Sequence, residues 1–404
     1  MNKQLILTLA ALLLIPAAAF AGFTDTLPKN TFMLDVSYVQ SSLDKVWDHH
    51  GEERALLDEI ERYEPGGGLQ GVLSADAEAS FSVLVAQLAY GITDSLTLGV
   101  GVPIVLETRV ETNLSWEEGN YQTQLGRSYS EEDFWGWAES MGQPKPPDSW
   151  EGNHGVMGDV QIALIYRWSD RVSWFREHAL ASNFLIFGTL PTGTHADPEE
   201  LVSAGTSSWE LHSNGDLGVH FGVDKFFPES LDGRLILGAE LFYEALLPHT
   251  FEAPQGEKNP LLLNARPYTG RWYTVDGGDF SGFSVQTDVV PYKGPALGTW
   301  LVKGDKEAAA KLPPLVTVGV RYTFNHLQQT DYESDSSLWD WEKEKEWRPG
   351  YKNILQFQLQ VALPRVGLPM IPYVRYRNLS WIPGKNTRAA DTLTAGTRIL
   401  MKFW

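Results

Sequence analysis

The sequence contains no cysteine among its 404 residues, and after Gly22 it has no apolar run of about 18 residues. The lack of cysteine excludes disulfides, thiol catalysis and zinc sites of the cysteine type. The lack of long apolar runs predicts that no helix after Gly22 spans a membrane. If such a chain is exported, it must be stabilised by a large core or by closed backbone hydrogen bonding.

Motifs for enzymatic chemistry are also missing. There is no His-Glu-x-x-His, P-loop or Gly-x-Ser-x-Gly sequence, and Gly99-Val100-Gly101 lacks the third glycine and the helix of a dinucleotide site. His49-His50 and His212-Ser213 lie in predicted loops, where outer-membrane lipases and deacylases can hold comparable pairs. With nine histidines in the chain, chance adjacency explains these pairs better. We therefore predict that the protein is not an enzyme and uses no cofactor.

Basic residues are few. The chain has 32 lysines and arginines against 51 acids, which gives a net charge of −19. Nucleic acid is excluded as a partner, because phosphate binding needs clustered positive charge. The acidic loops contain no Asp-x-Asp-x-Asp-Gly calcium sequence, so we predict no metal site. Divalent cations that bridge lipopolysaccharide to these loops are the weaker alternative.

The first 21 residues form a predicted signal peptide. Lys3 supplies a positive start, Leu5–Ala19 is mostly apolar, and Ala19-Phe20-Ala21 matches a small-x-small cleavage site. An uncleaved N-terminal anchor is the alternative. We expect residues 22–404 to form one domain.

Apolar and polar residues alternate along segments of about ten residues, a pattern typical of strands with one apolar face. The clearest segment is Leu355–Leu363, where apolar residues alternate with glutamines. Eleven segments can be identified directly, beginning near Thr31, Ala77, Leu96, Val160, Ala179, Leu217, Leu235, Val316, Leu355, Met370 and Leu393. A soluble β-sandwich would also alternate, so the connections must decide between the two folds.

Short and long connections follow one another in turn. The short ones are Gly91–Ser95, Ser169–His178, Pro228–Gly233 and Pro364–Leu368, and the long ones are Gln40–Asp76, Glu111–Gly155, Leu190–Ser213, Leu247–Gly278, Asn325–Gly350 and Ser380–Asp391. Outer-membrane barrels have this asymmetry, with tight periplasmic turns and long outer loops. Both ends of the chain are then periplasmic, which requires an even number of strands. We therefore infer a further strand within Ser281–Lys303, followed by a turn at Gly304–Lys311.

The fold class predicted is all-β: an antiparallel transmembrane β-barrel of about 12 strands, with short periplasmic turns and long outer loops. In the first outer loop, Leu56–Tyr63 could form a short helix that ends at Gly66-Gly67-Gly68.

Charged residues on the lipid face of a barrel cost roughly 2–4 kcal/mol each near the midplane, so we expect strand charges to face the lumen. Strand parity assigns the following polar residues to a candidate solute path: Arg167, Arg321, Arg375, Arg377, Arg398, Lys402, Glu240, Glu244, Gln356, Gln358 and Gln360. Such residues can fill the interior with structural salt bridges or line a selective pore. Among them Arg375, Arg377 and Arg398 are the best candidates for attracting an anionic or carboxylate group.

Five loop tryptophans are candidates for capturing a solute at the mouth of the barrel: Trp116, Trp135, Trp137, Trp339 and Trp341. Packing within the loops and anchoring at the membrane interface are the alternative roles, and we favour these.

Two stretches resemble known outer-membrane sequences. Ala89–Pro103 (AYGITDSLTLGVGVP) resembles a YGLTDxLxLGVGxP hairpin, and Gly158–Arg167 followed by Gly188–Gly193 resembles a GDxxLxxKYR … LPTG pattern. The chain thus resembles outer-membrane transporters associated with meta-pathway phenol degradation, or a related family of uncharacterised barrels. The resemblance covers about Gln87–Phe227 with the final strand, and it implies passive uptake of small hydrophobic or aromatic molecules.

We predict passive uptake of small hydrophobic, aromatic or amphipathic solutes through a mixed-charge lumen in the outer membrane of a Gram-negative bacterium. The alternative is a structural or interaction barrel with a filled lumen, whose acidic outer loops bind a ligand or lipopolysaccharide. The expected partners are outer-membrane lipid, lipopolysaccharide, the solute, and the barrel-assembly machinery. That machinery reads aromatic-terminated strands like the one ending at Phe403-Trp404.

Overall fold

The computed structural model describes residues 23–56, 59–123, 126–140, 145, 148–152, 155–193, 215–227, 234–252, 272–295, 297–298, 301, 312–329, 331–334 and 349–402. Within these ranges no helix has the length and apolar character needed to cross a membrane. The predicted signal peptide lies outside them, so its cleavage stays a prediction.

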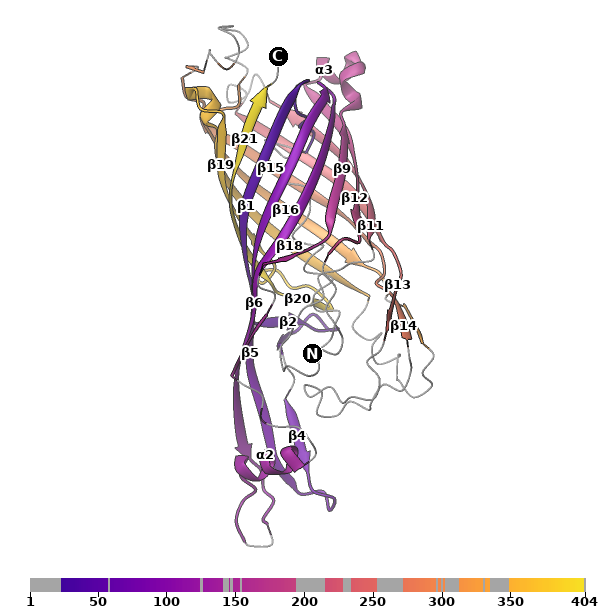
Figure 1. Cartoon of the computed structure of the whole chain (residues 1–404), viewed down its shortest axis with the longest axis vertical. Helices are drawn as coiled ribbons and strands as arrows, with labels where there is room; N and C mark the ends of the chain where they lie inside the picture. The colour runs from indigo at the N-terminus through magenta and orange to yellow at the C-terminus, as the bar shows by residue number, and fades with distance from the viewer. Residues whose placement is uncertain are drawn as a thin grey trace.

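Twelve antiparallel strands form the wall of a closed barrel (Figure 1). Each pairs with its neighbours in chain order, and β1 pairs with β21 to close the wall. The wall strands are β1 (Thr31–Leu43), β5 (Leu69–Thr93), β6 (Leu96–Glu118), β9 (Val160–Tyr166), β10 (Leu180–Leu190), β11 (Asp216–Phe226), β12 (Leu235–Leu246), β15 (Phe280–Tyr292), β16 (Val316–Leu327), β18 (Gly350–Val361), β19 (Met370–Asn378) and β21 (Asp391–Lys402). The predicted fold class is confirmed, and β15 is the strand inferred from parity alone.

The outer surface of the wall is apolar. Every wall strand exposes at least one large apolar side chain, for example Tyr38, Leu88, Leu98, Ile162, Ile186, Leu217, Leu241, Phe283, Val318, Leu359, Val374 and Leu393. Polar residues at the alternate positions, such as Asp35, His220 and Gln360, are buried on the inner face. This distribution is the inverse of a water-soluble protein, and it requires a bilayer to cover the outer surface.

An arginine on the lipid face should be strongly destabilising. Leu241 lies in the middle of β12 and is 62% exposed. We expect Leu241→Arg to lower the free energy of unfolding by roughly 2–4 kcal/mol, measured by urea unfolding in lipid vesicles. Asn113→Arg, on a strand segment beyond the apolar outer surface, is the matched control and should change it little. Equal effects at both positions would contradict the assignment of the lipid face.

The two ends of the barrel differ. At the end that we call the turn end, β5 and β6 are joined through Asp94-Ser95, and β9 and β10 through η1 (Trp168–Arg171) and α3 (Ser173–Glu177). η4 (Leu363–Val366) joins β18 to β19 at the same end. The turn end is uppermost in Figure 1, where the chain also finishes. In outer-membrane barrels the end with short turns faces the periplasm.

The opposite end, the loop end, carries small sheets outside the wall. One consists of β2 (Lys45–Trp47), β3 (Glu53–Ala55) and β20 (Thr387–Arg388), and the other of β13 (His249–Glu252), β14 (Trp272–Asp276) and β17 (Asp331–Ser334). A two-residue strand, β8 (Val156–Met157), pairs with β6.

At the loop end, β5 and β6 continue together far beyond the wall as an arm (Figure 1). The arm comprises residues 69–82 of β5, residues 107–118 of β6, β4 (Ile60–Tyr63), β7 (Ser149–Gly152) and α2 (Glu131–Ser140). A register shift at Ser82/Val83 marks its base. Beyond that shift the outward row of β6 changes from apolar to polar residues such as Glu107, Arg109 and Glu111, as expected where the strand leaves the lipid.

The arm corrects two predictions about the loops. Leu69–Asp76 and Glu111–Glu118, predicted as loop, are strand, so both long loops are shorter than predicted. The helix suggested at Leu56–Tyr63 is wrong, because Ile60–Tyr63 pairs with β5. The open hydrogen-bonding edge of β5 outweighs the weak helical preference of this short segment.

Candidate functional site

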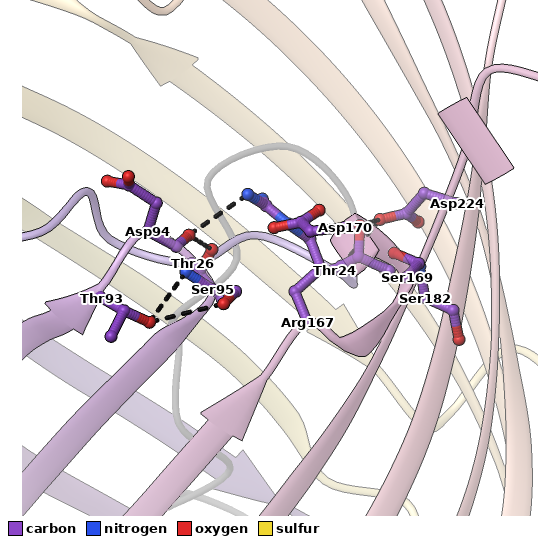
Figure 2. Close-up of polar contacts among 10 residues, drawn as sticks. All are labelled: Thr24, Thr26, Thr93, Asp94, Ser95, Arg167, Ser169, Asp170, Ser182 and Asp224. Atoms are coloured by element: carbon purple, nitrogen blue, oxygen red, sulfur yellow. Dashed lines mark hydrogen bonds and ion pairs between the residues drawn. The ribbon is translucent and has the colours of Figure 1, made fainter. Parts of the chain in front are cut away.

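The residues before β1 lie inside the barrel at the turn end. We call Phe23–Asn30 the N-terminal segment. The Leu27 amide donates a hydrogen bond to Thr97 Oγ1 on the inner face of β6 (2.8 Å), and Leu27 is buried. Thr26 Oγ1 donates to the Asp94 carbonyl at 2.8 Å (Figure 2). The segment therefore enters the lumen past the β5–β6 turn.

Asp224 on β11 anchors the beginning of this segment. Its carboxylate accepts hydrogen bonds from the Phe23 amide (3.1 Å), the Thr24 amide (2.7 Å) and Thr24 Oγ1 (2.6 Å). Figure 2 shows Thr24 and Asp224 side by side. Asp224 is 0% exposed, and hydrogen bonds to a buried carboxylate are stronger than bonds between neutral groups.

Phe23 lies over two inward-facing glycines. A Cβ on Gly238 would come within 2.7 Å of the Phe23 ring, and a Cβ on Gly222 within 2.9 Å of Phe23 Cβ. Asn183 Nδ2 donates to the Phe23 carbonyl (2.8 Å), and the Arg321 guanidinium lies 4.2 Å from the ring centroid. The segment thus contacts inner-face residues of β10, β11, β12 and β16, and it occupies the lumen at this level.

This segment was not predicted from the sequence. Alternation along β11 and β12 places Asp224 and Gly238 on the inner face, but it gives no link to the residues before the first strand. A possible signal was a buried aspartate beside inward-facing glycines on neighbouring strands, because such glycines leave space for another part of the chain.

Acidic residues gather on the inner face of β11 and β12. This acidic wall consists of Asp216, Asp224, Glu240 and Glu244. Glu240 Oε1 lies 3.0 Å from His220 Nδ1, and Asp216 accepts a hydrogen bond from Thr189 Oγ1 (2.6 Å). The predicted path residues Glu240 and Glu244 are therefore on one wall of the lumen.

The arginines gather on β16, β19 and β21, on the other side of β15. Arg398 on β21 is 0% exposed and pairs with Asp35 on β1 (Nε to Oδ2, 3.1 Å). Asp35 also accepts from Tyr373 Oη (2.9 Å), and Arg398 donates to Gln360 Oε1 (3.1 Å). Since Asp35 and Arg398 are register partners, their ion pair spans the seam between the first and last strands.

Arg321, Arg375 and Arg377 are half-buried, and we call them the arginine cluster. Arg375 donates from Nε and Nη2 to Gln358 Oε1 (3.3 and 3.2 Å), and Arg321 Nε donates to Gln286 Oε1 (2.9 Å). Gln356 is the register partner of both Arg321 and Arg377. The glutamine ladder of β18 therefore lies between the arginines. The structure places nine of the eleven predicted path residues on two walls of the lumen, leaving Arg167 and Lys402 apart.

Two of those residues lie at the turn end instead of the middle of the lumen. Arg167 Nε bonds both carboxylate oxygens of Asp170 (2.8 and 2.9 Å), and its Nη2 donates to the Asp94 carbonyl (3.2 Å; Figure 2). Lys402 is exposed near the end of β21. Neither belongs to the arginine cluster.

Three of the five candidate loop tryptophans are described, and these lie in the arm. Trp116 stacks on Phe134 of α2 (4.8 Å between centroids), Trp135 Nε1 donates to Glu131 (3.0 Å), and the Arg62 guanidinium lies 3.3 Å from the Trp137 ring centroid. The contacts of Trp116 and Trp137 join α2 to the strands of the arm, and that of Trp135 lies within α2, which matches the packing alternative, while solute capture stays a prediction. Trp339 and Trp341 lie outside the described residues.

An ion pair also fixes the start of α2. Arg127 Nη2 donates to Asp133 Oδ1 (2.7 Å), and the Ser130 amide donates to Asp133 Oδ2 (2.9 Å). The hydrogen bonds from Arg127, followed by that from the Ser130 amide, hold the pKa of Asp133 well below its usual range. The helix start therefore remains ordered by a carboxylate at neutral pH.

Comparison with solved structures gives a match over nearly the whole chain. The crystal structure of an outer membrane channel from Pseudomonas putida F1 aligns with a TM-score of 0.54 at 9% sequence identity, covering 94% of this chain and 99% of that chain. The fold is that of an outer-membrane β-barrel. A toluene transporter from Ralstonia pickettii, TbuX, aligns at a TM-score of 0.35 and 9% identity over 94% of this chain and 90% of its own.

TodX, a toluene transporter from Pseudomonas putida, aligns at a TM-score of 0.33 and 12% identity over 98% of this chain and 93% of its own. Comparison with protein-family models and with curated proteins gave no match. The resemblance to transporters associated with phenol degradation therefore stays a prediction.

Proposed function

We propose that the protein is an outer-membrane channel through which small amphipathic or aromatic molecules diffuse passively. The observation that carries the proposal is the state of Arg375, which forms no ion pair with any described carboxylate. A barrel filled only for stability would pair such charges, because an uncompensated charge in the interior is costly. Arg398, which is buried and paired with Asp35, is an example of the structural alternative.

An apolar side of the lumen supports solutes with an apolar part. Two clusters of buried apolar residues occupy inward-facing positions away from the arginine cluster, and the second borders the acidic wall. They are Val39, Val83, Val85 and Val105 on β1, β5 and β6, and Ala163, Ile165, Leu185 and Phe187 on β9 and β10. A solute with one polar and one apolar end meets both kinds of surface inside this barrel.

The N-terminal segment is the proposed gate of this channel. It is held by hydrogen bonds and by the packing of Phe23, and no strand pairing ties residues 23–30 to the wall. A segment bound in this way can leave its place without opening the barrel. Diffusion of a solute past the turn end then requires only a local displacement.

Flux through proteoliposomes tests the proposed function. Liposomes that contain the folded barrel are expected to swell faster in arabinose and in phenylalanine than liposomes containing urea-unfolded protein, because only a closed barrel supplies an aqueous path. Folding is checked by the shift in electrophoretic mobility on heating. Absence of faster swelling with both solutes, with the barrel folded, would rule the proposal out.

An interaction barrel is the second candidate, and the arm favours it. The outward face of the arm is acidic, and Glu78 and Glu111 lie directly opposite each other there. Such a face extends beyond the lipid, where divalent cations would bridge its carboxylates to the phosphates of lipopolysaccharide. Capture of purified lipopolysaccharide by a barrel that passes no solute would favour this second function over the channel.

A further inference from the structure

We infer that Arg321, Arg375 and Arg377 form a binding subsite for the carboxylate of a small organic anion. The inference deepens the proposed function, on which it rests, because it names the class of solute that the lumen retains.

The backbone register brings the three side chains together. Arg375 and Arg377 are two residues apart on β19, so both point to the same side of the sheet. Arg377 is opposite Gln356 on β18, and Gln356 is opposite Arg321 on β16. Three positively charged groups therefore lie within two strand spacings on one inner wall.

Arg375 forms no ion pair with a carboxylate of the described residues. A guanidinium has five N–H donors, and Arg375 uses two of them on a single neutral oxygen of Gln358. The ionisable groups that act on it are the Tyr373 phenol and three arginines: Arg398, Arg377 and Arg321. Like charges this close in a partly dehydrated lumen attract an anion strongly, because solvent screens them poorly.

The arginine cluster can still be reached from the lumen. Arg321, Arg375 and Arg377 retain accessible surface, whereas Arg398 has none. The donors that Arg375 does not use on Gln358 are therefore available for a ligand. Planar guanidinium groups bind carboxylates through two parallel hydrogen bonds, which suits a carboxylate better than a spherical anion.

The surroundings favour a monoanion with an apolar body. The Phe23 ring lies 4.2 Å from the Arg321 guanidinium and the Tyr373 ring 5.5 Å from that of Arg375, so both guanidinium groups have an aromatic neighbour. Glu240, Asp288 and Asp224 also act on Arg321 and offset part of its charge, so the site suits one negative charge better than two. A small aromatic or alkyl monocarboxylate satisfies both conditions.

Benzoate and benzamide provide the test, because they share their shape and differ in charge. In isothermal titration of the full-length mature barrel in detergent, benzoate is expected to bind at least about tenfold more tightly than benzamide, as the loss of a charge-assisted pair implies. Equal affinities of the wild-type protein for the two compounds, or no saturable benzoate binding, would overturn the inference.

Variants then assign the binding to the cluster. Arg375→Gln is expected to weaken the binding of benzoate about tenfold and to leave the binding of benzamide unchanged. Arg375→Lys should keep part of the affinity for benzoate, because lysine retains the charge but lacks the planar guanidinium that forms two parallel hydrogen bonds. Arg109→Gln on the arm, whose side chain pairs with Glu111, is the control that should leave binding unchanged. Loss of benzoate binding in the Arg109 variant, or full binding in Arg375→Gln, would contradict the assignment.

A barrel that passes arabinose but does not prefer benzoate to benzamide would refute this inference alone. A folded barrel that passes no solute would refute the proposed function.

Discussion

Replacing Asp224 with alanine is expected to raise the single-channel conductance of the barrel several-fold. The change removes the acceptor of three hydrogen bonds that hold Phe23 and Thr24 in the lumen. Each bond to a carboxylate contributes roughly 1.5–3 kcal/mol, so the variant loses most of the free energy that holds the N-terminal segment in its bound position. Conductance in planar bilayers, recorded at fixed salt, measures the effect directly.

Asp216→Ala is the matched control, because Asp216 is also a buried acid of β11 but bonds Thr189 instead of the N-terminal segment. Its conductance should stay close to that of the wild-type protein. Deletion of residues 23–28 should reproduce the increase seen with Asp224→Ala. If neither the deletion nor Asp224→Ala changes the conductance, the N-terminal segment is not the gate.

Breaking the ion pair at the seam should give the largest loss of stability. Arg398→Met leaves Asp35 as a buried carboxylate without its cation, and removal of one partner of a buried pair costs about 3–5 kcal/mol. The free energy of unfolding in vesicles, obtained from urea titration, is expected to fall by that amount. The strands β1 and β21 would then separate at lower denaturant concentrations than other strand pairs.

The double replacement Asp35→Met with Arg398→Met provides the contrast. It removes both charges and so should destabilise the barrel less than Arg398→Met alone, because no unpaired charge remains in the interior. If the free energy of unfolding of Arg398→Met is less than about 1 kcal/mol below that of the wild-type protein, the pair of Asp35 and Arg398 must be solvated in the native barrel and not buried.

The strand order and the lipid face were predictable because both depend on local sequence. Lipid on one side of the wall and polar groups on the other impose alternation on each strand independently of its partners. The segment from Leu355 to Leu363 is clear for this reason, and parity alone sufficed to infer β15. The arginines of β19 were assigned correctly to the inner face by the same argument.

Prediction was weaker where both faces of a strand are apolar. On β5, Val83 and Val85 face inward while Leu84 and Leu88 face the lipid, so alternation could not separate the two faces. β10 is ambiguous in the same way, since Leu185 faces inward and Ile186 outward. The arm was missed because its outward row is polar, which resembles a loop in sequence.

The contacts of the candidate site could not be predicted, because they join distant parts of the chain. Strand register decides which arginines are paired. Arg398 pairs with Asp35, which lies near the other end of the chain, whereas Arg375 donates to the neutral Gln358. A parity argument gives the side on which a residue lies but not its neighbours on other strands.

The position of Phe23 has a consequence for the timing of assembly. Its partners Asn183 and Asp224 lie 160 and 201 residues further along the chain. Residues 23–30 therefore cannot take up their place in the lumen until β10 and β11 are part of the wall. A folding defect in the middle of the chain is expected to leave the N-terminal segment unbound even where β1 has paired.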